Sequence, residues 1–471
     1  MTDEELARKK RRHRNERIAA AILLAVAIGA TFAVREWNER EERALRRDQS
    51  YIPKAAVVTP EALLLQEYVR IDTSTPAGAA AGARWLVAVF ARNGVRAELI
   101  ESAPDRLSVY ARIAGKDKGH GLLLFNHIDV VKPVGAWNSP PFGAQIVAGS
   151  MYGRGTLDMK GIAICQLAAF IEIAKSGRKP EHDLVFLATP DEETGSEYGM
   201  QWLLAHRPDV FEGLGYGITE GGITEILRER MTYFGIETAG KQVVRVTLRA
   251  PDQKTMQDFR FALEPYMQPR QPGRILPVVR EYFHAAAPTR VAFRPYLADI
   301  DWAIREGHYW RLPMAYRELT QNTIWASDTL DREGKWEMEI HLRNLPDENP
   351  DERLAWLVGL AKPRGIEVVH IWAKEGPTVV SRTDTPLFAI LAREAKRRYQ
   401  TPVGPQLGYR SSSDSRFLRP RGIVCYGVSP YPVDLPQSLS IHKSNERIRL
   451  DHFADGVDFM KNVVLEWAEQ D

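Results

Sequence analysis

Short, largely apolar runs of strand length alternate with helix-like segments over residues 60–237, and this alternation limits the possible folds more than any other feature. The runs lie at Leu107–Ile113, Gly121–Phe125 and Asp183–Ala188, and a helical run from Gly161 to Lys175 separates the last two. Apolar runs of this length suit strands that are covered on both faces, as in parallel sheets. We therefore predict an α/β domain with a central, mostly parallel sheet flanked by helices.

The middle of the chain has a different pattern. Gln242–Leu248 and Trp336–Leu342 alternate apolar and polar residues, and a long stretch rich in Pro and Arg lies between them. Alternation with period two is typical of strands that have one face in water. We predict a smaller α+β domain at 238–374, inserted into a larger domain that is made of residues 59–237 and 375–471.

The N-terminus combines a dense basic cluster with an apolar run. Residues 8–17 contain seven Lys or Arg, and the 17 residues from Ile18 to Val34 carry no charge. This length is the lower limit for a membrane-spanning helix. The positive-inside rule would then keep a basic tail, 1–17, in the cytoplasm. We expect a single-pass transmembrane anchor at 18–34, a stalk or linker at 35–58 and a folded part on the far, periplasmic side of the membrane. A cleaved signal peptide is the alternative.

Charge and cysteine content exclude three classes of protein. The chain has 63 Lys and Arg against 61 Asp and Glu, a net charge of +2, which is far from the basic balance of a dedicated nucleic-acid binder. Its two cysteines, Cys165 and Cys425, lie in apolar stretches. Neither a disulfide scaffold nor a cysteine-rich zinc module is therefore available.

Histidine and acidic residues occur where predicted strands and helices meet loops. His127 and Asp129 end an apolar strand, and their spacing puts both side chains on one face of an extended backbone. Such a pair suits a metal-bound imidazole that is oriented by a carboxylate. Asp158 follows a glycine-rich loop just before an apolar helix, where it can face a cation or cap the helix.

Three consecutive acids, Asp191, Glu192 and Glu193, directly follow another apolar strand. Like charges packed at a strand end are unfavourable unless a cation or a proton lies among them. A solvated acidic turn is the alternative interpretation. Glu220 and His442 are two further candidates, and each of them could also be an ordinary loop residue.

Most of these side chains lie at, or just after, the end of a predicted strand, where open α/β sheets gather their ligands. Five His and carboxylate ligands with one bridging water would satisfy two zinc ions about 3.5–4 Å apart. The set contains no thiolate, and its members are His127, Asp158, Glu193, Glu220 and His442.

From about residue 60 to 470 the chain resembles the aminoacylase/carboxypeptidase family of co-catalytic zinc metallopeptidases. The motifs that carry the resemblance are His127-x-Asp129, Trp137 with Pro140-Pro-Phe142, Gly153-Arg-Gly-Thr-Leu-Asp158-Met-Lys-Gly161, Asp191-Glu-Glu-x-Gly195 and Ile441-His442-x-x-Asn445-Glu446. The Glu220-Gly-Gly222 form and the expected anchor are most similar to carboxypeptidase S-like members. The resemblance implies that residues 59–237 and 375–471 form a catalytic domain and 238–374 a lid domain.

The resemblance also implies two zinc sites that share one ligand. His127 and Glu220 would complete one site, Glu193 and His442 the other, and Asp158 would bridge them. Cobalt or manganese could replace zinc, because His and carboxylate sites accept several ions.

For catalysis, the resemblance implies that Asp129 orients His127 and that Glu192 is the general base. The reaction would be hydrolysis of an amide bond in a peptide or N-acyl amino acid by a metal-activated water. Arg416 would hold a carboxylate of the substrate, and a surface arginine is the alternative there.

The lid departs from the family pattern. Family members commonly carry a Gly-His-x-Ser segment whose histidine reaches the active site of a partner subunit, whereas the equivalent stretch here, Leu248–Met256, has no histidine. Lys254, His284 or His308 could then supply the oxyanion donor, and a homodimer stays an open question. The alternative function is a membrane-tethered, non-catalytic relative that binds a metal or ligand without turnover.

Overall fold

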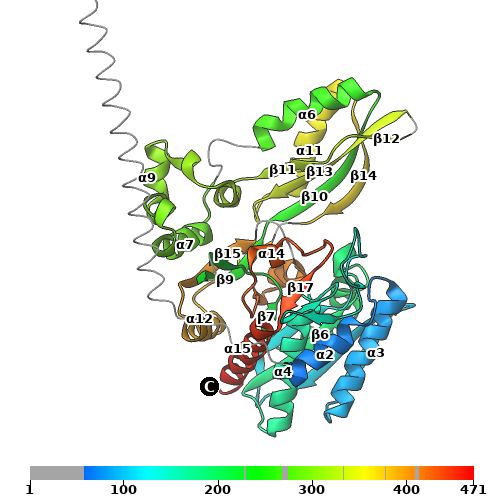
Figure 1. Cartoon of the computed structure of the whole chain (residues 1–471), viewed down its shortest axis with the longest axis vertical. Helices are drawn as coiled ribbons and strands as arrows, with labels where there is room; N and C mark the ends of the chain where they lie inside the picture. Colours follow the sequence, from blue (N-terminus) through cyan, green and yellow to red (C-terminus); the bar gives the residue numbers. More distant parts are fainter. Residues whose placement is uncertain are drawn as a thin grey trace, which may run out of the picture.

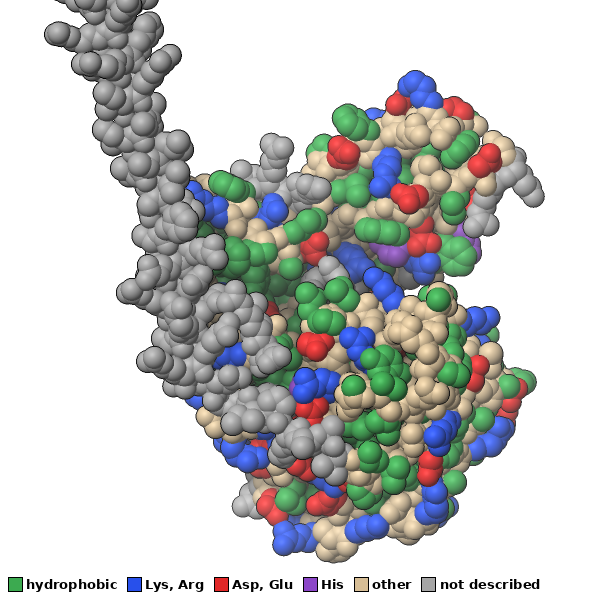
Figure 2. Space-filling model, viewed as in Figure 1, with side chains coloured by type: hydrophobic (Ala, Val, Ile, Leu, Met, Phe, Trp, Pro, Cys, Tyr) green, Lys and Arg blue, Asp and Glu red, His purple; other side chains and the backbone are tan. Residues whose placement is uncertain are grey.

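The computed structural model describes residues 58–227, 230–267, 274–332, 334–376, 378–408 and 413–470. Figure 1 shows a larger part built around the sheet that contains β6 and β7, and a smaller sheet above it that contains β10 and β13. An open groove separates the two parts on the face shown in Figure 2.

The larger sheet has nine strands among the described residues, in the order β1-β2-β6-β3-β7-β16-β9-β15, with β8 paired to β9. The strands are β1 (Glu98–Ala103), β2 (Arg106–Ile113), β3 (Asp117–His127), β6 (His182–Thr189), β7 (Leu214–Thr219), β8 (Thr224–Leu227), β9 (Arg230–Gly240), β15 (Val403–Gly408) and β16 (Val424–Gly427).

The sheet is mixed, which corrects the prediction of a mostly parallel one. Strands β6, β3, β7 and β16 run parallel to one another, but β2 pairs antiparallel with both β1 and β6. Strand β9 also pairs antiparallel with β8 and β16. Strands joined by a short turn, such as β1 and β2, can pair only in the antiparallel direction, because a parallel pair needs a long crossover connection.

Helices cover both faces of this sheet, and the central strands are apolar for that reason. Leu122 and Leu124 of β3 belong to the core on one face, whereas Leu123 and Phe125 belong to the core on the other. The first face is covered by α2 (Pro60–Val69), α3 (Pro76–Arg92), α4 (Lys160–Ser176), α12 (Pro386–Tyr399) and α15 (Leu450–Ala468), and the second by α5 (Met200–His206) and α13 (Ser415–Leu418).

A second sheet, which we call the lid sheet, lies within the predicted inserted domain. Its strands are β10 (Gln242–Ala250), β11 (Thr323–Ala326), β12 (Leu330–Arg332), β13 (Lys335–Asn344) and β14 (Glu367–Lys374), all paired antiparallel. The alternating residues Val244, Val246 and Leu248 are buried under α6 (Gln253–Met267) and α11 (Pro350–Ala361).

Part of the predicted inserted domain packs on the larger sheet instead. Helices α7 (Pro277–Ala286), α8 (Arg294–Ala298) and α9 (Ile300–Arg305) share a core with Tyr233 of β9 and Leu407 of β15. The lid sheet therefore does not hold all of residues 238–374. The division of the chain at 237 and 374 stays a prediction.

The predicted membrane anchor is not upheld. None of the helices in the described ranges is long and apolar enough to cross a membrane. The longest of them, α15, has 19 residues but carries charged side chains, Asp451, Asp455 and Lys461 among them. The tail at 1–17, the apolar run at 18–34 and the stalk as far as residue 57 lie outside the described residues. The expected single-pass topology, cytoplasmic N-terminus and periplasmic placement therefore have no support among the described helices.

Candidate metal centre

Three neighbouring parallel strands, β6, β3 and β7, bring the acids and a histidine to one edge of the larger sheet. His127 is the last residue of β3, and Glu220 comes directly after β7. Glu192 and Glu193 begin a short 3-10 turn three residues after β6. Because parallel neighbours end at the same edge, these side chains converge where α/β sheets bind their ligands.

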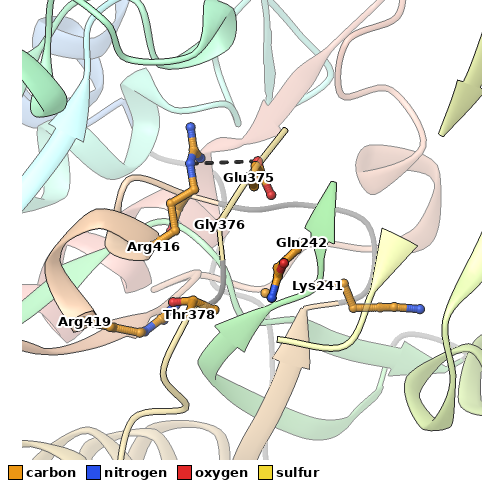
Figure 3. A pocket seen from close by; sticks show the side chains of 9 residues that line it. Lys241, Gln242, Glu375, Gly376, Thr378, Arg416 and Arg419 are labelled. Carbon is orange, nitrogen blue, oxygen red and sulfur yellow. Dashed lines mark ion pairs between the residues drawn. The ribbon is translucent and has the colours of Figure 1, made fainter. Parts of the chain in front are cut away.

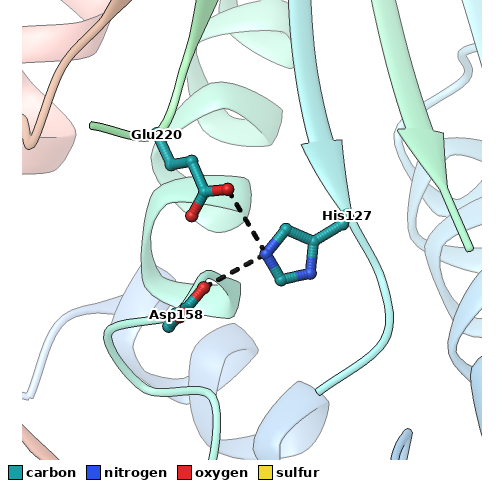
Figure 4. A group of neighbouring side chains, drawn as sticks. All are labelled: His127, Asp158 and Glu220. Carbon is teal, nitrogen blue, oxygen red and sulfur yellow. Dashed lines mark hydrogen bonds and ion pairs between the residues drawn. The ribbon is translucent and has the colours of Figure 1, made fainter. Parts of the chain in front are cut away.

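His127 is buried, and its ring is fixed from both sides. Its Nε2 lies 3.1 Å from Asp158 Oδ1 and 3.7 Å from Glu220 Oε1 (Figure 4). Its Nδ1 lies 2.9 Å from the backbone oxygen of Asp129. If Nδ1 carries the proton and donates to that carbonyl, the Nε2 lone pair is free to bind a metal.

The carboxylate of Asp129 has a role that the sequence did not reveal. It lies 3.6 Å from His127 Nδ1, but it accepts hydrogen bonds from the backbone N–H groups of Glu192, at 3.2 Å, and Glu193, at 3.1 Å. Asp129 therefore contacts the histidine through its backbone oxygen and accepts hydrogen bonds from the acidic turn with its side chain.

Asp158 faces both histidines of the predicted set. While Oδ1 faces His127, Oδ2 lies 2.9 Å from Nε2 of His442, and that nitrogen lies 3.1 Å from Glu193 Oε1. The five side chains form two groups of three that share Asp158, and the ligand atoms within each group lie within 4.8 Å of one another. This donor set and the shared carboxylate fit two divalent ions side by side.

A buried ion pair ties the loop of Asp158 to the loop of His442. Glu446 is fully buried against the guanidinium of Arg154, and its Oε1 accepts hydrogen bonds from the backbone N–H groups of Leu157, at 2.9 Å, and Asp158, at 3.3 Å. Arg154 Nη2 also donates to the backbone oxygen of Lys443 at 3.2 Å. The two loops are joined further by a small antiparallel sheet of β4 (Gln145–Val147), β5 (Ser150–Tyr152) and β17 (Arg447–Arg449).

Glu446 and Arg154 stand inside the sequence motifs, but no role was predicted for either. Their partnership joins residues that are 292 positions apart, so only the fold reveals it. The available signal in the sequence was their place in the motifs, where Arg154 lies between Gly153 and Gly155 and Glu446 follows Asn445.

Burial and mutual repulsion shape the protonation of the metal-free site. Burial raises the pKa of Asp129 to about 6 and, together with the charge of Asp158, that of Glu220 to about 7. Burial alone would also raise the pKa of Asp158, but hydrogen bonds from the two histidines lower it well below its usual value. Hydrogen bonds to Asp158 and Glu193 raise the pKa of His442 to about 11. Protons therefore occupy positions that divalent ions can take, so metal binding will release them.

Glu192 lies beside the two ligand groups but belongs to neither of them. Burial raises the pKa of its carboxyl group well above the usual value, although the nearby Arg416 opposes this. Arg416 Nη1 donates to Glu192 Oε1 at 3.1 Å. The structure thus brings together Glu192 and Arg416, the residues predicted as general base and substrate ligand.

The three candidate oxyanion donors lie elsewhere. Lys254 is exposed on α6, where it pairs with Asp258, and α6 packs on the side of the lid sheet that faces away from the larger part (Figure 1). His284 is exposed on α7. His308 packs against the ring of Trp302.

We expect Glu446→Gln to destabilise the protein by about 3–5 kcal/mol, because it leaves the buried Arg154 without a counter-charge. Urea unfolding would measure the change. Glu469→Gln is the control, since Glu469 pairs with Arg178 at the surface and should contribute less than about 1 kcal/mol. Equal effects of the two substitutions would contradict the structural role given to Glu446.

The comparisons with known proteins agree with this geometry. The model of peptidase family M20/M25/M40 matches residues 123–466. The chain is 26% identical over 339 residues to the succinyl-diaminopimelate desuccinylase of Stenotrophomonas maltophilia. The aligned region covers 70% of this chain and 79% of that protein.

Two solved structures show the same fold. The M20 family metallo-carboxypeptidase Sso-CP2 from Sulfolobus solfataricus has a TM-score of 0.67 and 18% identity, covering 88% of this chain and all of that one (100%). The dipeptidase Dug1p from Saccharomyces cerevisiae has a TM-score of 0.65 and 14% identity, covering 87% and 96%. These comparisons favour catalysis over the non-catalytic alternative. The chain belongs to peptidase family M20/M25/M40, the aminoacylase/carboxypeptidase type of metallopeptidase, and it is an enzyme.

Proposed function

We propose that the enzyme hydrolyses an amide bond in a small peptide or an N-acyl amino acid, with two zinc ions as its cofactor. The observation that carries the proposal is the buried acid Glu192 beside two ligand groups that share Asp158. The relatives named as a desuccinylase, a carboxypeptidase and a dipeptidase support this class of substrate. The His and carboxylate donors suit zinc, and they also suit cobalt or manganese.

His127 and Glu220 would hold one ion, Glu193 and His442 the other, with Asp158 between them. Two ions bound there would activate a water molecule for attack and polarise the scissile carbonyl group. Glu192 is not needed as a ligand, so its carboxylate can accept a proton from the attacking water and then deliver it to the leaving nitrogen. A raised pKa suits this task, because a more basic carboxylate takes up a proton more readily.

We assign Arg416 to the substrate's carboxylate. Its guanidinium is largely buried next to Glu192 and donates a hydrogen bond to Glu192 Oε1 at 3.1 Å. A planar guanidinium can bind a carboxylate through two parallel hydrogen bonds. A substrate carboxylate bound there would lie next to the proposed general base.

The test is an activity panel of N-acyl amino acids and dipeptides, assayed with the full chain. We expect hydrolysis that chelation abolishes and that added zinc restores, with two ions bound per chain by elemental analysis. Amidation of the substrate's carboxyl group should raise KM, because Arg416 then loses its partner. Bound metal without hydrolysis of any member of the panel would contradict the proposed function.

A further inference from the structure

Arg416 lies among three carboxylates, of which only one is the proposed general base. Its Nη1 is 3.1 Å from Glu192 Oε1, its Nε is 3.8 Å from Glu375 Oε1 and its Nη2 is 4.0 Å from Asp414 Oδ1. All four side chains are largely buried, so solvent and salt screen their charges little. Figure 3 shows the ion pair between Arg416 and Glu375 in the pocket that these two residues help to line.

Glu375 belongs to the connection between the lid sheet and the larger part. It directly follows β14, and its Oε2 accepts a hydrogen bond from the backbone N–H of Val243 in β10 at 2.8 Å. Its own backbone N–H donates to the oxygen of Val243 at 3.1 Å. These two bonds fix Glu375 to the first residues of the lid sheet.

The second connection passes beside the first. Lys241, between β9 and β10, is buried and donates to the backbone oxygens of Glu318, at 2.9 Å, and Gln321, at 2.7 Å. Lys241 and Glu375 line the same pocket (Figure 3). The position of the lid sheet at these connections therefore fixes where the carboxylate of Glu375 lies relative to Arg416.

We propose that Glu375 is a positioning residue that shares Arg416 with Glu192 and so sets how the guanidinium of Arg416 is held beside the proposed general base. When Glu375 attracts the guanidinium, the hydrogen bond from Arg416 to Glu192 is weakened. Without the charge of Glu375, Arg416 would pair only with its other carboxylates and would hold the Glu192 oxygen that the reaction needs. Because Glu375 directly follows β14, Arg416 links the lid sheet to the proposed general base. This inference rests on the proposed function of Glu192.

The test is Glu375→Gln in the full chain. The amide oxygen can still accept the hydrogen bond from Val243, but the side chain no longer attracts Arg416 by charge. We expect kcat to fall about tenfold, with KM unchanged or lower and the unfolding temperature unchanged. Asp384→Asn is the matched control, because Asp384 is an exposed acid on the same returning segment and pairs with Arg382 at the surface. It should leave kcat unchanged.

A double-mutant cycle separates positioning from a merely structural role. In an Arg416→Met background, Glu375→Gln should cause no further loss of kcat, because the shared arginine is gone. An equal loss in both backgrounds, or a kcat of E375Q equal to that of the wild type, would overturn the inference and leave the proposed function intact. A wild-type enzyme without metal-dependent hydrolysis would overturn both.

Discussion

Glu192→Gln should lower kcat by about 10²–10⁴-fold while both metal sites stay filled. The carboxylate is the only described acid that is buried beside the two ligand groups and hydrogen-bonded to Arg416 without belonging to either group. General acid–base catalysis typically contributes a factor of this size, which corresponds to about 3–5 kcal/mol of activation free energy. Gln has nearly the same shape but cannot accept the proton. Steady-state kinetics at saturating substrate, combined with elemental analysis, would measure both effects.

Glu197→Gln is the matched control for this prediction. Glu197 is an exposed acid in the same loop after β6, and its replacement should change kcat by less than about twofold, because surface substitutions away from special features have small effects. Loss of metal from Glu192→Gln would show that Glu192 is a ligand. An unchanged kcat would show that another group accepts the proton.

The strands and helices that are buried on both sides could be predicted from the sequence, because a buried position requires an apolar residue. The run Gly121–Phe125 lies in β3, whose successive side chains enter the cores on opposite faces of the sheet. The predicted helix Gly161–Lys175 lies in α4, which is buried along most of its length. Apolar residues are then needed at nearly every position, and the pattern is easy to detect.

Other features depend on contacts between distant segments, which a local pattern does not contain. Strand β1 was not predicted, and the predicted run Leu107–Ile113, which lies in the antiparallel strand β2, was not distinguished from the parallel strands, because strand direction is set by the connection and not by residue type. Helix α7 packs on β15, more than a hundred positions later in the chain. The bond from Asp129 to the turn of Glu192 likewise involves a backbone N–H group, which every residue but proline offers.

The candidate ligands fall between these two cases. Most of them lie at the end of a strand or just before a helix, so the sequence could indicate that they gather at one edge of the sheet, whereas His442 lies in a turn before β17. The sequence could not show which oxygen faces which histidine. That arrangement depends on the hydrogen bonds between Glu446 and the loop of Asp158, which hold the loop of His442, near the end of the chain, against the loop of Asp158.

Asp158→Asn should remove metal from both sites, because Asp158 is the one residue common to the two ligand groups. An amide offers one oxygen, and its NH₂ group would face the second ion with no lone pair to donate. We expect the affinity for both ions to fall by more than about a hundredfold, since even residues that only orient a ligand change metal affinity 10–100-fold. Glu220→Gln, by contrast, alters one group only and should preferentially weaken one ion.

Calorimetric titration of the metal-free variants with zinc would separate these outcomes, and circular dichroism would verify that each variant is folded. The Asp158 variant should show no tight site, whereas the Glu220 variant should keep one. Tight binding of two ions by Asp158→Asn would mean that each histidine binds its ion together with a different carboxylate. In that case His127 and His442 would bind independent metal ions. The short distances from Asp158 to His127, 3.1 Å, and to His442, 2.9 Å, would then reflect hydrogen bonding in the metal-free protein and not a bridging ligand.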